Sequence, residues 1–469
     1  MNMIKFGTSG WRAVIADEFT FANVRLVALA IAQYLKKEGL ANREVVVGYD
    51  TRFMSNLFAQ QAGAVLTREG IPVLYSKRDV PTPVISFTVI DQKAGGAINI
   101  TASHNPPQYN GLKFSPASGA PAPPQVTQAI EANIRKLQKE GVVLEPVEPQ
   151  RDLFAEKDLA PAYIQDLESK VDFSALAASP QKVAYNALWG TGRGYVDRIL
   201  QDAGWRVDVM HKEVNPLFGG RRPEPSEEEM PDFLEMVKEG DYTLGLATDG
   251  DGDRFGIADK GGKFITANHI LALVFRYLVE ERRLEGGVVR SVATTHLLDR
   301  LAQHYGRPIY ETSVGFKFIG EYILEGKVVM GGEESAGLSI KGHVPEKDGI
   351  IACLLVAEMV AQKGATVGEL LEDLFHLVGP LHSRRVNIPL TPELKKELPQ
   401  KLAAHPSQVA GLKVTDVITI DGTKLVLEDG SWLLFRPSGT EPLARLYLEA
   451  ESQKRLDILE EAGKKLLGI

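Results

Sequence analysis

The stretch EVVVGYDTRFMSNLFAQQAGAVLTREGIPVLYS, residues 44–76, decides the class of fold. Residues 44–52 form an apolar, β-branched run typical of a buried strand, and residues 71–76 form a second one. Between them, residues 55–70 predict a helix, with Ser55 as its N-cap and Gly70 at its end. A helix that joins two strands predicts a strand–helix–strand crossover, the unit of a parallel or mixed sheet covered by helices.

This unit occurs twice more along the chain. KVAYNALWGTGRGYVDRILQDAGWRVDVM, residues 182–210, and GVVRSVATTHLLDRLAQHYGRPIYETS, residues 287–313, both place a helix between two strands. The units start roughly 100 residues or more apart, whereas solenoid repeats have periods of about 20 to 50 residues. The sequence therefore predicts three similar α/β domains in series.

The C-terminal part has a different pattern. Residues 414–452 alternate apolar and polar side chains around Asp-Gly turns, which is typical of antiparallel strands, and residues 453–467 predict a closing helix. The predicted fold class is α/β, with three similar mixed-sheet domains followed by a smaller α+β domain. The predicted domains are 1–150, 151–261, 262–378 and 379–469, with linkers near 140–152, 259–264 and 378–385.

The composition limits the classes of function. The chain has 469 residues, 44% of them hydrophobic and 24% charged, and a net charge of -8, which argues against a general nucleic-acid or membrane surface. Cys353 is the only cysteine, so a disulfide framework and a thiolate zinc site are excluded. The N-terminal residues resemble no targeting segment and no window is apolar long enough to span a bilayer, so we expect a cytoplasmic protein.

The segment LGLATDGDGDRFGIAD, residues 244–259, is the clearest metal-binding signal. Three aspartates alternate with glycines just after a predicted strand: Asp249, Asp251 and Asp253. Three converging carboxylates predict a divalent cation with open coordination positions, which suits Mg²⁺ that holds a phosphate oxygen. A calcium EF-hand loop is excluded because its turn glycine would be Arg254 and its bidentate glutamate would be Lys260. A solvated Asp-Gly turn is the alternative interpretation.

The segment TASHNP, residues 101–106, places a hydroxyl beside an imidazole and an amide. Ser103 is not in a G-x-S-x-G elbow, so the acyl-hydrolase template does not fit. The hydroxyl is a candidate carrier of a phosphoryl group, with His104 and Asn105 as hydrogen-bond donors and Lys113 nearby. An Asx-type turn with a capping serine is the alternative.

Two further loops carry polar groups suited to a phosphosugar. MGGEESAGLS, residues 330–339, pairs Glu333 with Ser335, which suits vicinal sugar hydroxyls and equally suits a helix N-cap. FRPSGTEPLARL, residues 435–446, joins Arg436 to a Ser-Gly-Thr loop that could hold a phosphate dianion, although Pro-Ser-Gly is also a common turn. Two lysines on Gly-containing turns are candidates for the same site or ordinary surface charges: Lys317 and Lys347.

Together these motifs resemble the α-D-phosphohexomutase superfamily, the phosphoglucomutase and phosphomannomutase group. TASHNP is similar to its phosphoserine loop, DGDGDR to its metal loop, GGEES to its sugar-recognition loop and RPSGTEP to its phosphate-binding loop. The resemblance covers essentially the whole chain, with one motif in each predicted domain and in the family's order. It implies four domains arranged around a central cleft.

The resemblance also implies roles for individual residues. Ser103 would be the phosphorylated nucleophile and would bind Mg²⁺ together with the three aspartates. Arg12 and Arg254 would lie near the phosphoryl group, and Lys113 would be the candidate general base. Glu333 and Ser335 would hold sugar hydroxyls. The phosphate that is not transferred would be held by four residues: Arg436, Ser438, Gly439 and Thr440.

The implied reaction moves a phosphate between C1 and C6 of a hexose in two transfers. The enzyme donates its own phosphoryl group, a hexose 1,6-bisphosphate turns over in the cleft, and Ser103 receives the other phosphate. One departure concerns Gly337, because the phosphomannomutase-like branch has a histidine there. The GEES form is closer to the phosphoglucomutase branch, with Lys347 as the replacement proton carrier, and this favours glucose phosphate.

Several alternatives stay open at this point. The sugar phosphate could be a mannose, glucosamine or pentose phosphate, because a few loop contacts set the specificity. A phosphatase with a phosphoserine intermediate would have no need of the RPSGTEP domain to retain its intermediate. A sugar-phosphate sensor would have no need of a nucleophile. We expect a small-molecule partner, no nucleic acid and no membrane, and a monomer or homodimer.

Overall fold

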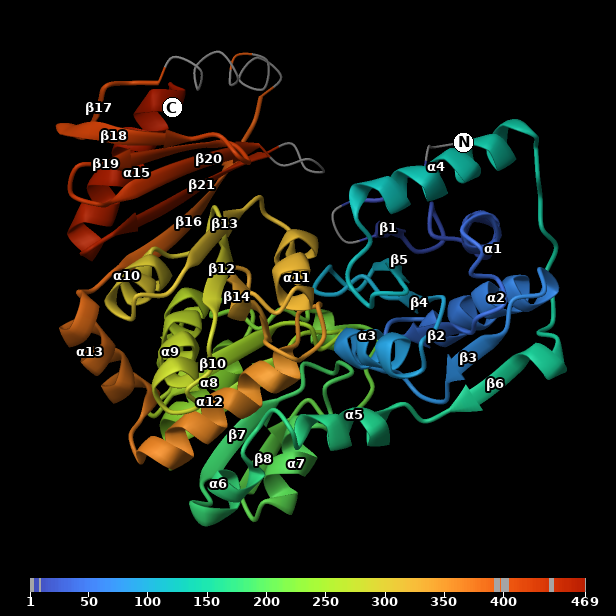
Figure 1. Cartoon of the computed structure of the whole chain (residues 1–469), viewed down its shortest axis with the longest axis horizontal. Helices are drawn as coiled ribbons and strands as arrows, with labels where there is room; N and C mark the ends of the chain where they lie inside the picture. Colours follow the sequence, from blue (N-terminus) through green and yellow to red (C-terminus); the bar gives the residue numbers. More distant parts are fainter. Residues whose placement is uncertain (1–3, 8–9, 392–396, 398–404, 438–442, 469) are drawn as a thin grey trace.

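The computed structural model describes residues 4–7, 10–391, 397, 405–437 and 443–468. The described residues form four β-sheets, one after another along the chain (Figure 1). Three of them are mixed sheets with helices, and the last is an antiparallel sheet. The predicted fold class is therefore confirmed.

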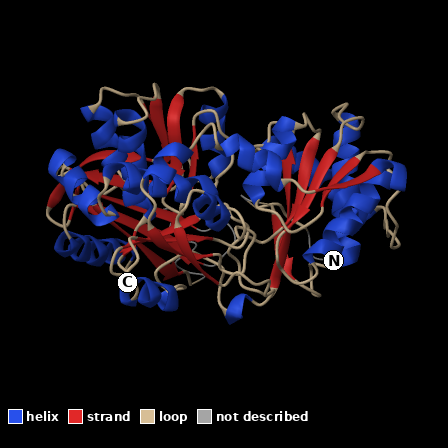
Figure 2. Cartoon of the chain, turned by 90° about the horizontal axis from the view of Figure 1, so that it is seen from below, coloured by secondary structure: helices blue, strands red, loops and turns tan. Residues whose placement is uncertain are grey.

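The first sheet has the strand order β1-β5-β4-β2-β3-β6, and helices lie on both sides of it (Figure 2). Its strands are β1 (Trp11–Val14), β2 (Val45–Tyr49), β3 (Val73–Ser76), β4 (Gly96–Ile100), β5 (Tyr109–Pro116) and β6 (Phe154–Lys157). Its helices are α1 (Phe21–Lys37), α2 (Ser55–Arg68), α3 (Thr82–Asp91) and α4 (Pro124–Lys139). β2 and β3 pair in parallel, which confirms the first crossover.

The predicted N-cap of α2 is wrong by one residue. Met54 occupies the cap position, and Ser55 is the first residue of the helix. The Ser55 hydroxyl instead donates a hydrogen bond to Asp50 over 2.8 Å. The Ser55 hydroxyl, which the sequence pattern assigned to the helix cap, is therefore bonded to the buried Asp50 carboxylate that follows β2.

The second and third sheets confirm the other two crossovers, since β7 pairs with β8 and β12 pairs with β13 in parallel. The second sheet, in the order β11-β10-β9-β7-β8, contains β7 (Lys182–Asn186), β8 (Arg206–Met210), β9 (Leu244–Thr248), β10 (Phe255–Asp259) and β11 (Phe264–Ile265). The third, in the order β13-β12-β14-β15, contains β12 (Gly287–Ser291), β13 (Ile309–Thr312), β14 (Val328–Glu333) and β15 (Gly337–Ile340). The helices of this region are α5 (Ala160–Leu167), α6 (Phe173–Ala178), α7 (Val196–Asp202), α8 (Pro231–Glu239), α9 (Ala267–Glu280), α10 (Leu297–His304), α11 (Phe316–Leu324), α12 (Gly349–Lys363) and α13 (Val367–Val378).

One predicted linker is part of a sheet, and the strand that follows another returns to an earlier sheet. Residues 259–264 form the turn of an antiparallel hairpin between β10 and β11, so they are part of the second sheet and not a linker. β6, which follows the predicted linker at 140–152, returns to pair in parallel with β3. Gly and Lys residues favour a turn as much as a linker, and only strand pairing distinguishes the two.

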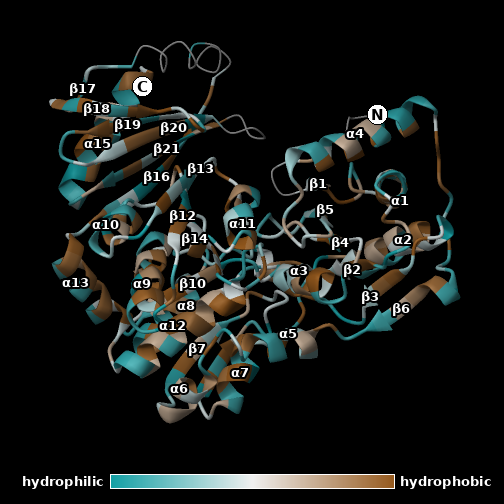
Figure 3. Cartoon of the chain, viewed as in Figure 1, coloured by the Kyte–Doolittle hydropathy of each residue, from teal (hydrophilic) through white to brown (hydrophobic). Residues whose placement is uncertain are grey.

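The second and third sheets share one hydrophobic core. α12 follows the third sheet in the chain but packs against β9 and β10 of the second as well as against α9. Its residues from Gly349 to Ala361 are all buried, and Figure 3 shows the helix largely in hydrophobic colours. In the described part of the chain no single helix is long and apolar enough to cross a membrane; α12 and α13 pass that test only as a pair bent by 82°.

The fourth sheet has the order β16-β21-β20-β19-β18-β17 and is packed against the closing helix. Its elements are β16 (His382–Pro389), β17 (Gln408–Val409), β18 (Leu412–Ile418), β19 (Thr423–Leu427), β20 (Trp432–Pro437), β21 (Leu443–Ala450) and α15 (Gln453–Leu467). The Asp-Gly pairs at 421–422 and 429–430 lie between successive strands, as predicted. The helix coincides with the predicted range 453–467.

Candidate active site

The TASHNP loop begins where β4 ends, and it turns sharply at Ser103. This residue has a φ of 50° and is 2% exposed. Its Oγ donates a hydrogen bond to Oδ2 of Asp249 over 2.8 Å and lies 3.3 Å from Nδ1 of His104. Burial and the nearby cations of Arg254 and Arg12 hold the pKa of His104 well below its usual range, so its imidazole is neutral beside the hydroxyl.

The DGDGDR loop follows β9 and brings three carboxylates together. One oxygen from each of Asp249, Asp251 and Asp253 lies within 4.8 Å of the others, and all three side chains are buried. Oδ1 of Asp251 and Oδ1 of Asp253 are buried without a hydrogen-bond partner. Buried anionic oxygens are costly unless they are paired. The donor set therefore fits a hard divalent cation, which these three aspartates would hold.

The electrostatics of the trio are unequal. Burial and the two neighbouring carboxylates raise the pKa of Asp249 well above its usual range. Burial also acts on Asp253, but the ammonium groups of Lys347 and Lys113 outweigh it and hold the pKa of Asp253 below its usual range. The raised pKa of Asp249 reflects repulsion among the three carboxylates as well as burial, and a divalent cation bound between them would relieve that repulsion.

Two buried lysines reach this loop, one from β5 of the first sheet and one from the segment between β15 and α12. Nζ of Lys113 on β5 lies 2.7 Å from Asp251 and 3.2 Å from Asp253, and Nζ of Lys347 lies 3.0 Å from Asp253. Burial lowers the pKa of both lysines, but the aspartates outweigh it and both values lie above the ordinary one. Both lysines therefore hold their protons in this structure.

The predicted arginines lie at the same place. Nη1 of Arg12 on β1 donates a hydrogen bond to Oδ1 of Asn105 over 2.8 Å. Nη1 of Arg254 lies 3.3 Å from Glu224, and its Nε lies 4.0 Å from Oδ1 of Asp253. The structure thus brings two guanidinium groups to the loops that carry Ser103 and the aspartates.

The GGEES loop is the turn of the β14–β15 hairpin. Glu333, at the end of β14, accepts a hydrogen bond from the main-chain N of Gly315 over 2.7 Å. Burial and the adjacent Glu334 raise the pKa of Glu333 to about 7. Ser335 is half-buried in the turn, and Lys317, on α11, is half-buried with its Nζ 5.2 Å from the ring centre of Phe318.

Gly337 makes room for Lys347. A Cβ added at position 337 would lie 2.5 Å from Cδ and 2.8 Å from Cγ of Lys347. These distances are too short for carbon atoms, so a side chain here would displace the lysine. Glycine at position 337, where the phosphomannomutase-like branch has a histidine, therefore leaves the space that the Lys347 side chain occupies.

The fourth motif is described only in part. Nε of Arg436, at the end of β20, lies 2.9 Å from Oδ2 of Asp421, and the same oxygen accepts a hydrogen bond from the main-chain N of Val314 over 3.0 Å. Asp421 thus joins the fourth sheet to the segment before α11. The other predicted residues of this loop lie outside the described residues: Ser438, Gly439 and Thr440.

Some functional residues escaped the sequence analysis. Thr82, at the start of α3, uses both its main-chain N and its hydroxyl to bond Asp251, over 2.8 and 2.6 Å. Asp421 and Arg52 are two more. A threonine after a proline is too common to predict a contact with a carboxylate 169 residues later, and no local signal could have found it.

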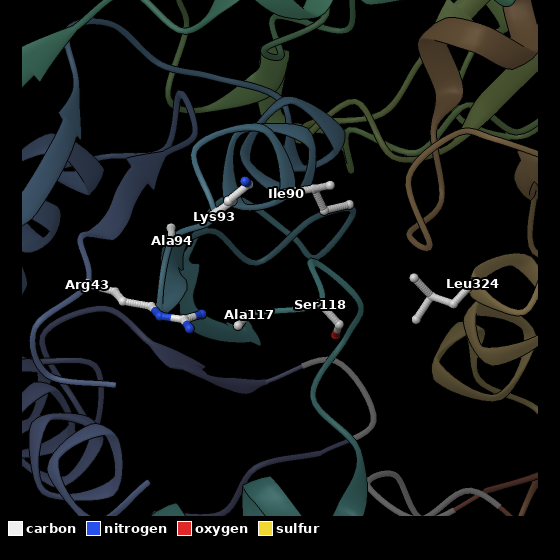
Figure 4. A pocket seen from close by; sticks show the side chains of 7 residues that line it. All are labelled: Arg43, Ile90, Lys93, Ala94, Ala117, Ser118 and Leu324. Atoms are coloured by element: carbon white, nitrogen blue, oxygen red, sulfur yellow. The ribbon is translucent and has the colours of Figure 1, made fainter. Parts of the chain in front are cut away.

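A cavity of about 530 Å³ lies elsewhere, between the first sheet and α11. Figure 4 shows Arg43, Lys93 and Ser118 on one side of it and Leu324 on the other. It contains none of the predicted site residues. The chemistry indicated by the four motifs is therefore not associated with this cavity.

Comparison with known proteins agrees with this geometry. Models of the phosphoglucomutase/phosphomannomutase domains match the chain in order: α/β/α domain I at 3–141, domain II at 161–262, domain III at 266–378 and the C-terminal domain at 386–463. A phosphoglucomutase/phosphomannomutase of Thermococcus kodakarensis is 31% identical, with 98% of each chain covered. The chain belongs to the phosphoglucomutase/phosphomannomutase family. It is accordingly an enzyme of the isomerase class, a phosphohexomutase.

Other relatives carry different substrate names. A proposed phosphoglucosamine mutase of Methanosphaera stadtmanae is 30% identical, with 98% of each chain covered. The solved structure of a proposed phosphomannomutase from Thermus thermophilus is 34% identical over 100% of both chains, with a TM-score of 0.88. Identity to family members thus fixes the type of chemistry and leaves the sugar open.

Proposed function

We propose that this phosphohexomutase interconverts glucose 1-phosphate and glucose 6-phosphate through a phosphoserine at position 103 and a hexose 1,6-bisphosphate. The observation that carries the proposal is the contact between Ser103 Oγ and Asp249 beside two unpartnered carboxylate oxygens. A hydroxyl at the edge of a cation site is suited to carry a phosphoryl group, because phosphoryl transfer depends on positioning and charge neutralisation.

In the first transfer the bond between Ser103 Oγ and phosphorus breaks and a bond from O6 of glucose 1-phosphate to phosphorus forms. The O6 proton leaves the sugar and a proton returns to Ser103 Oγ. In the second transfer the bond between O1 and phosphorus breaks, a bond from Ser103 Oγ to phosphorus forms again, Ser103 Oγ loses its proton, and O1 gains a proton. We propose that Lys347 and Lys113, both within 3.2 Å of the aspartates, are the proton carriers: an ammonium group that gives its proton to the oxygen losing phosphorus can then take the proton of the attacking oxygen.

The remaining residues would bind and orient. The aspartates would hold Mg²⁺, which when bound neutralises charge on a phosphoryl oxygen. Arg12 and Arg254 would contact the transferred phosphoryl group, with His104 and Asn105 beside it. Lys317, Glu333 and Ser335 would bind the sugar. The distal phosphate would be held by the last motif: Arg436, Ser438, Gly439 and Thr440.

The choice of glucose rests on Gly337. In the phosphomannomutase-like pattern a histidine stands there, and in this chain that space is filled by Lys347. The loops of the proposed site contact one another across all four sheets: Ser103 with Asp249, Asp253 with Lys347, and Asp421 with Val314. These contacts support a shared cleft.

We also propose a modified domain division. β6 and β11 pair with the sheets that precede them, which supports first and second boundaries after Lys157 and after Ile265, in place of 150 and 261. The third boundary, near 378, lies between α13 and β16. The cytoplasmic location and the monomer or homodimer stay predictions.

A coupled assay tests the proposed function. Glucose, mannose and glucosamine 1-phosphates are each supplied with Mg²⁺ and a trace of the matching 1,6-bisphosphate, and formation of the 6-phosphate is followed. The proposal expects the highest kcat/KM with glucose 1-phosphate and dependence on the bisphosphate. A higher value with another sugar would reassign the substrate, and release of inorganic phosphate at the same rate as turnover would indicate a phosphatase.

A further inference from the structure

Arg52 lies behind the loop that carries Ser103, and its side chain has no exposed surface. It follows β2, the first crossover strand, in the segment EVVVGYDTR, and it has no part in the proposed mechanism. A fully buried guanidinium is costly to desolvate unless every donor is used. The contacts of Arg52 show what it does.

All five N–H donors of the guanidinium are occupied. Nε donates to Asp50 at 3.1 Å. Nη1 donates to the carbonyl oxygens of Pro106 and Tyr109, each at 2.9 Å. Nη2 donates to the carbonyl oxygens of Ser103 and Asn105, at 2.5 and 2.6 Å. Arginine has five N–H groups in a fixed plane, so no donor remains and no other side chain could replace this pattern.

The loop needs these donors. Pro106 and Pro107 have no N–H, so this turn has few main-chain donors of its own: Asn105 N bonds the Ala102 carbonyl and Tyr109 N bonds the Pro106 carbonyl, each over 3.0 Å. Ser103 has a φ of 50°, a conformation that is strained for a residue other than glycine and persists only when its surroundings impose it. Arg52 supplies that constraint by binding the carbonyl of Ser103 itself.

Two connecting segments of the second sheet close the other side of this arrangement. The ring centre of Phe218, a fully buried residue, lies 5.0 Å from the Arg52 guanidinium carbon. A Cβ at Gly250 would lie 2.9 Å from the carbonyl oxygen of Ser103, so the metal loop approaches that oxygen as closely as a glycine allows. The main chain of Ser103 is thus held between Arg52 and the DGDGDR loop.

We infer that Arg52 is a positioning residue for phosphoryl transfer: it fixes the main chain of residues 103–109 so that Ser103 Oγ stays against Asp249. This inference rests on the proposed function. Arg52 contacts the carbonyl groups behind the nucleophile, and it acts through Ser103. A displacement of about 1 Å at a reacting group can lower a rate about 100-fold, so the effect belongs to kcat.

The test compares Arg52→Lys with Arg25→Lys in the full-length protein. Lysine keeps the charge next to Asp50 but cannot reach four carbonyls. Arg25 is a matched control, because it is a buried arginine on α1, a helix that accompanies the first sheet, and its Nε also donates to a main-chain carbonyl, that of Leu144, at 2.7 Å. We expect kcat with glucose 1-phosphate to fall about 100-fold in Arg52→Lys, with KM unchanged, and to stay at the wild-type value in Arg25→Lys.

Two further readouts separate positioning from a general loss of stability. Hydrogen exchange of the peptide that covers residues 101–112 should accelerate in Arg52→Lys and stay unchanged in Arg25→Lys. Intact mass after incubation with glucose 1,6-bisphosphate and Mg²⁺ should show less phosphoserine. If the lysine variant does not fold, Asp50→Asn/Arg52→Met, which removes the ion pair as a unit, is compared with Asp50→Asn alone.

The outcomes are distinct. A folded Arg52 variant with wild-type kcat overturns the inference, and so does failure of both Arg52 variants to fold, because a positioning residue is not required for folding. Equal loss of kcat in the Arg25 control also overturns it. If the wild-type protein itself shows neither mutase turnover nor phosphoserine, the proposed function fails, and the exchange data alone then decide whether Arg52 orders the loop.

Discussion

Ser103 donates a hydrogen bond to Asp249 over 2.8 Å, although 146 residues separate them in the chain. The serine follows β4 of the first sheet and the aspartate follows β9 of the second, so the contact joins two sheets at the ends of their strands. This is the position where α/β proteins commonly bind ligands. The contact makes the hydroxyl a neighbour of the predicted cation.

Removal of the Ser103 hydroxyl should abolish mutase turnover. For Ser103→Ala we expect kcat to fall on the order of a thousandfold or more, since the residue would carry the phosphoryl group in both transfers. Circular dichroism and the unfolding midpoint should match the wild-type protein. Ser118→Ala, at the separate cavity, is the control. Near-normal turnover in Ser103→Ala would exclude the covalent mechanism.

Replacement of Asp251 with Asn should weaken the metal site. We expect the Mg²⁺ concentration for half-maximal activity to rise at least about tenfold, because one of three charged ligands becomes neutral. Calorimetric titration of Mg²⁺ into the protein should show the same loss without any turnover. Asp259→Asn, which changes a buried aspartate of the same sheet outside the trio, is the control. Unaltered Mg²⁺ affinity in Asp251→Asn would contradict the assignment of the metal loop.

Gly337→Ala should damage the site through Lys347. The new Cβ would overlap the lysine side chain, and we expect a loss of about 1–3 kcal/mol in the free energy of unfolding together with a lower kcat/KM. A double-mutant cycle with Lys347→Ala measures the cause, because the overlap disappears when Cγ and Cδ are absent. If Gly337→Ala lowers the free energy of unfolding equally in the wild-type and the Lys347→Ala proteins, the packing explanation is wrong.

Glu333 should make stability depend on pH. Its pKa is raised from 4.5 to about 7 by burial and Glu334, against the opposing charges of Lys347 and Arg254. Between these two values the folded state binds more protons than the unfolded state, so this group's contribution to stability falls as pH rises from 4.5 to 7. Denaturant unfolding at several pH values should show a smaller decline in Glu333→Gln. Glu321→Gln, on the exposed side of α11, should follow the wild-type curve; identical slopes in all three proteins would contradict the prediction.

The sequence alone predicted the elements whose signals are local. A buried strand, an amphipathic helix and a second strand each have their own periodicity, so all three crossovers could be recognised. The DGDGDR loop could also be recognised, because its ligands lie within five consecutive residues. Local signals were less reliable at element ends: Ser55 binds Asp50 and does not cap its helix, and residues 259–264 are a hairpin turn.

The tertiary structure decided which segments that are distant in the chain contact one another. α12 covers a sheet that precedes it in the chain, Thr82 reaches Asp251, and Lys347 occupies the space that Gly337 leaves. Sequence periodicity states which face of an element is apolar and does not state which neighbour covers it. The amino-acid sequence therefore determined the chemistry of each loop. The packing of the sheets determined that Ser103 and three carboxylates share one site, because the distance from the serine to the aspartates depends on every contact between the first and second sheets.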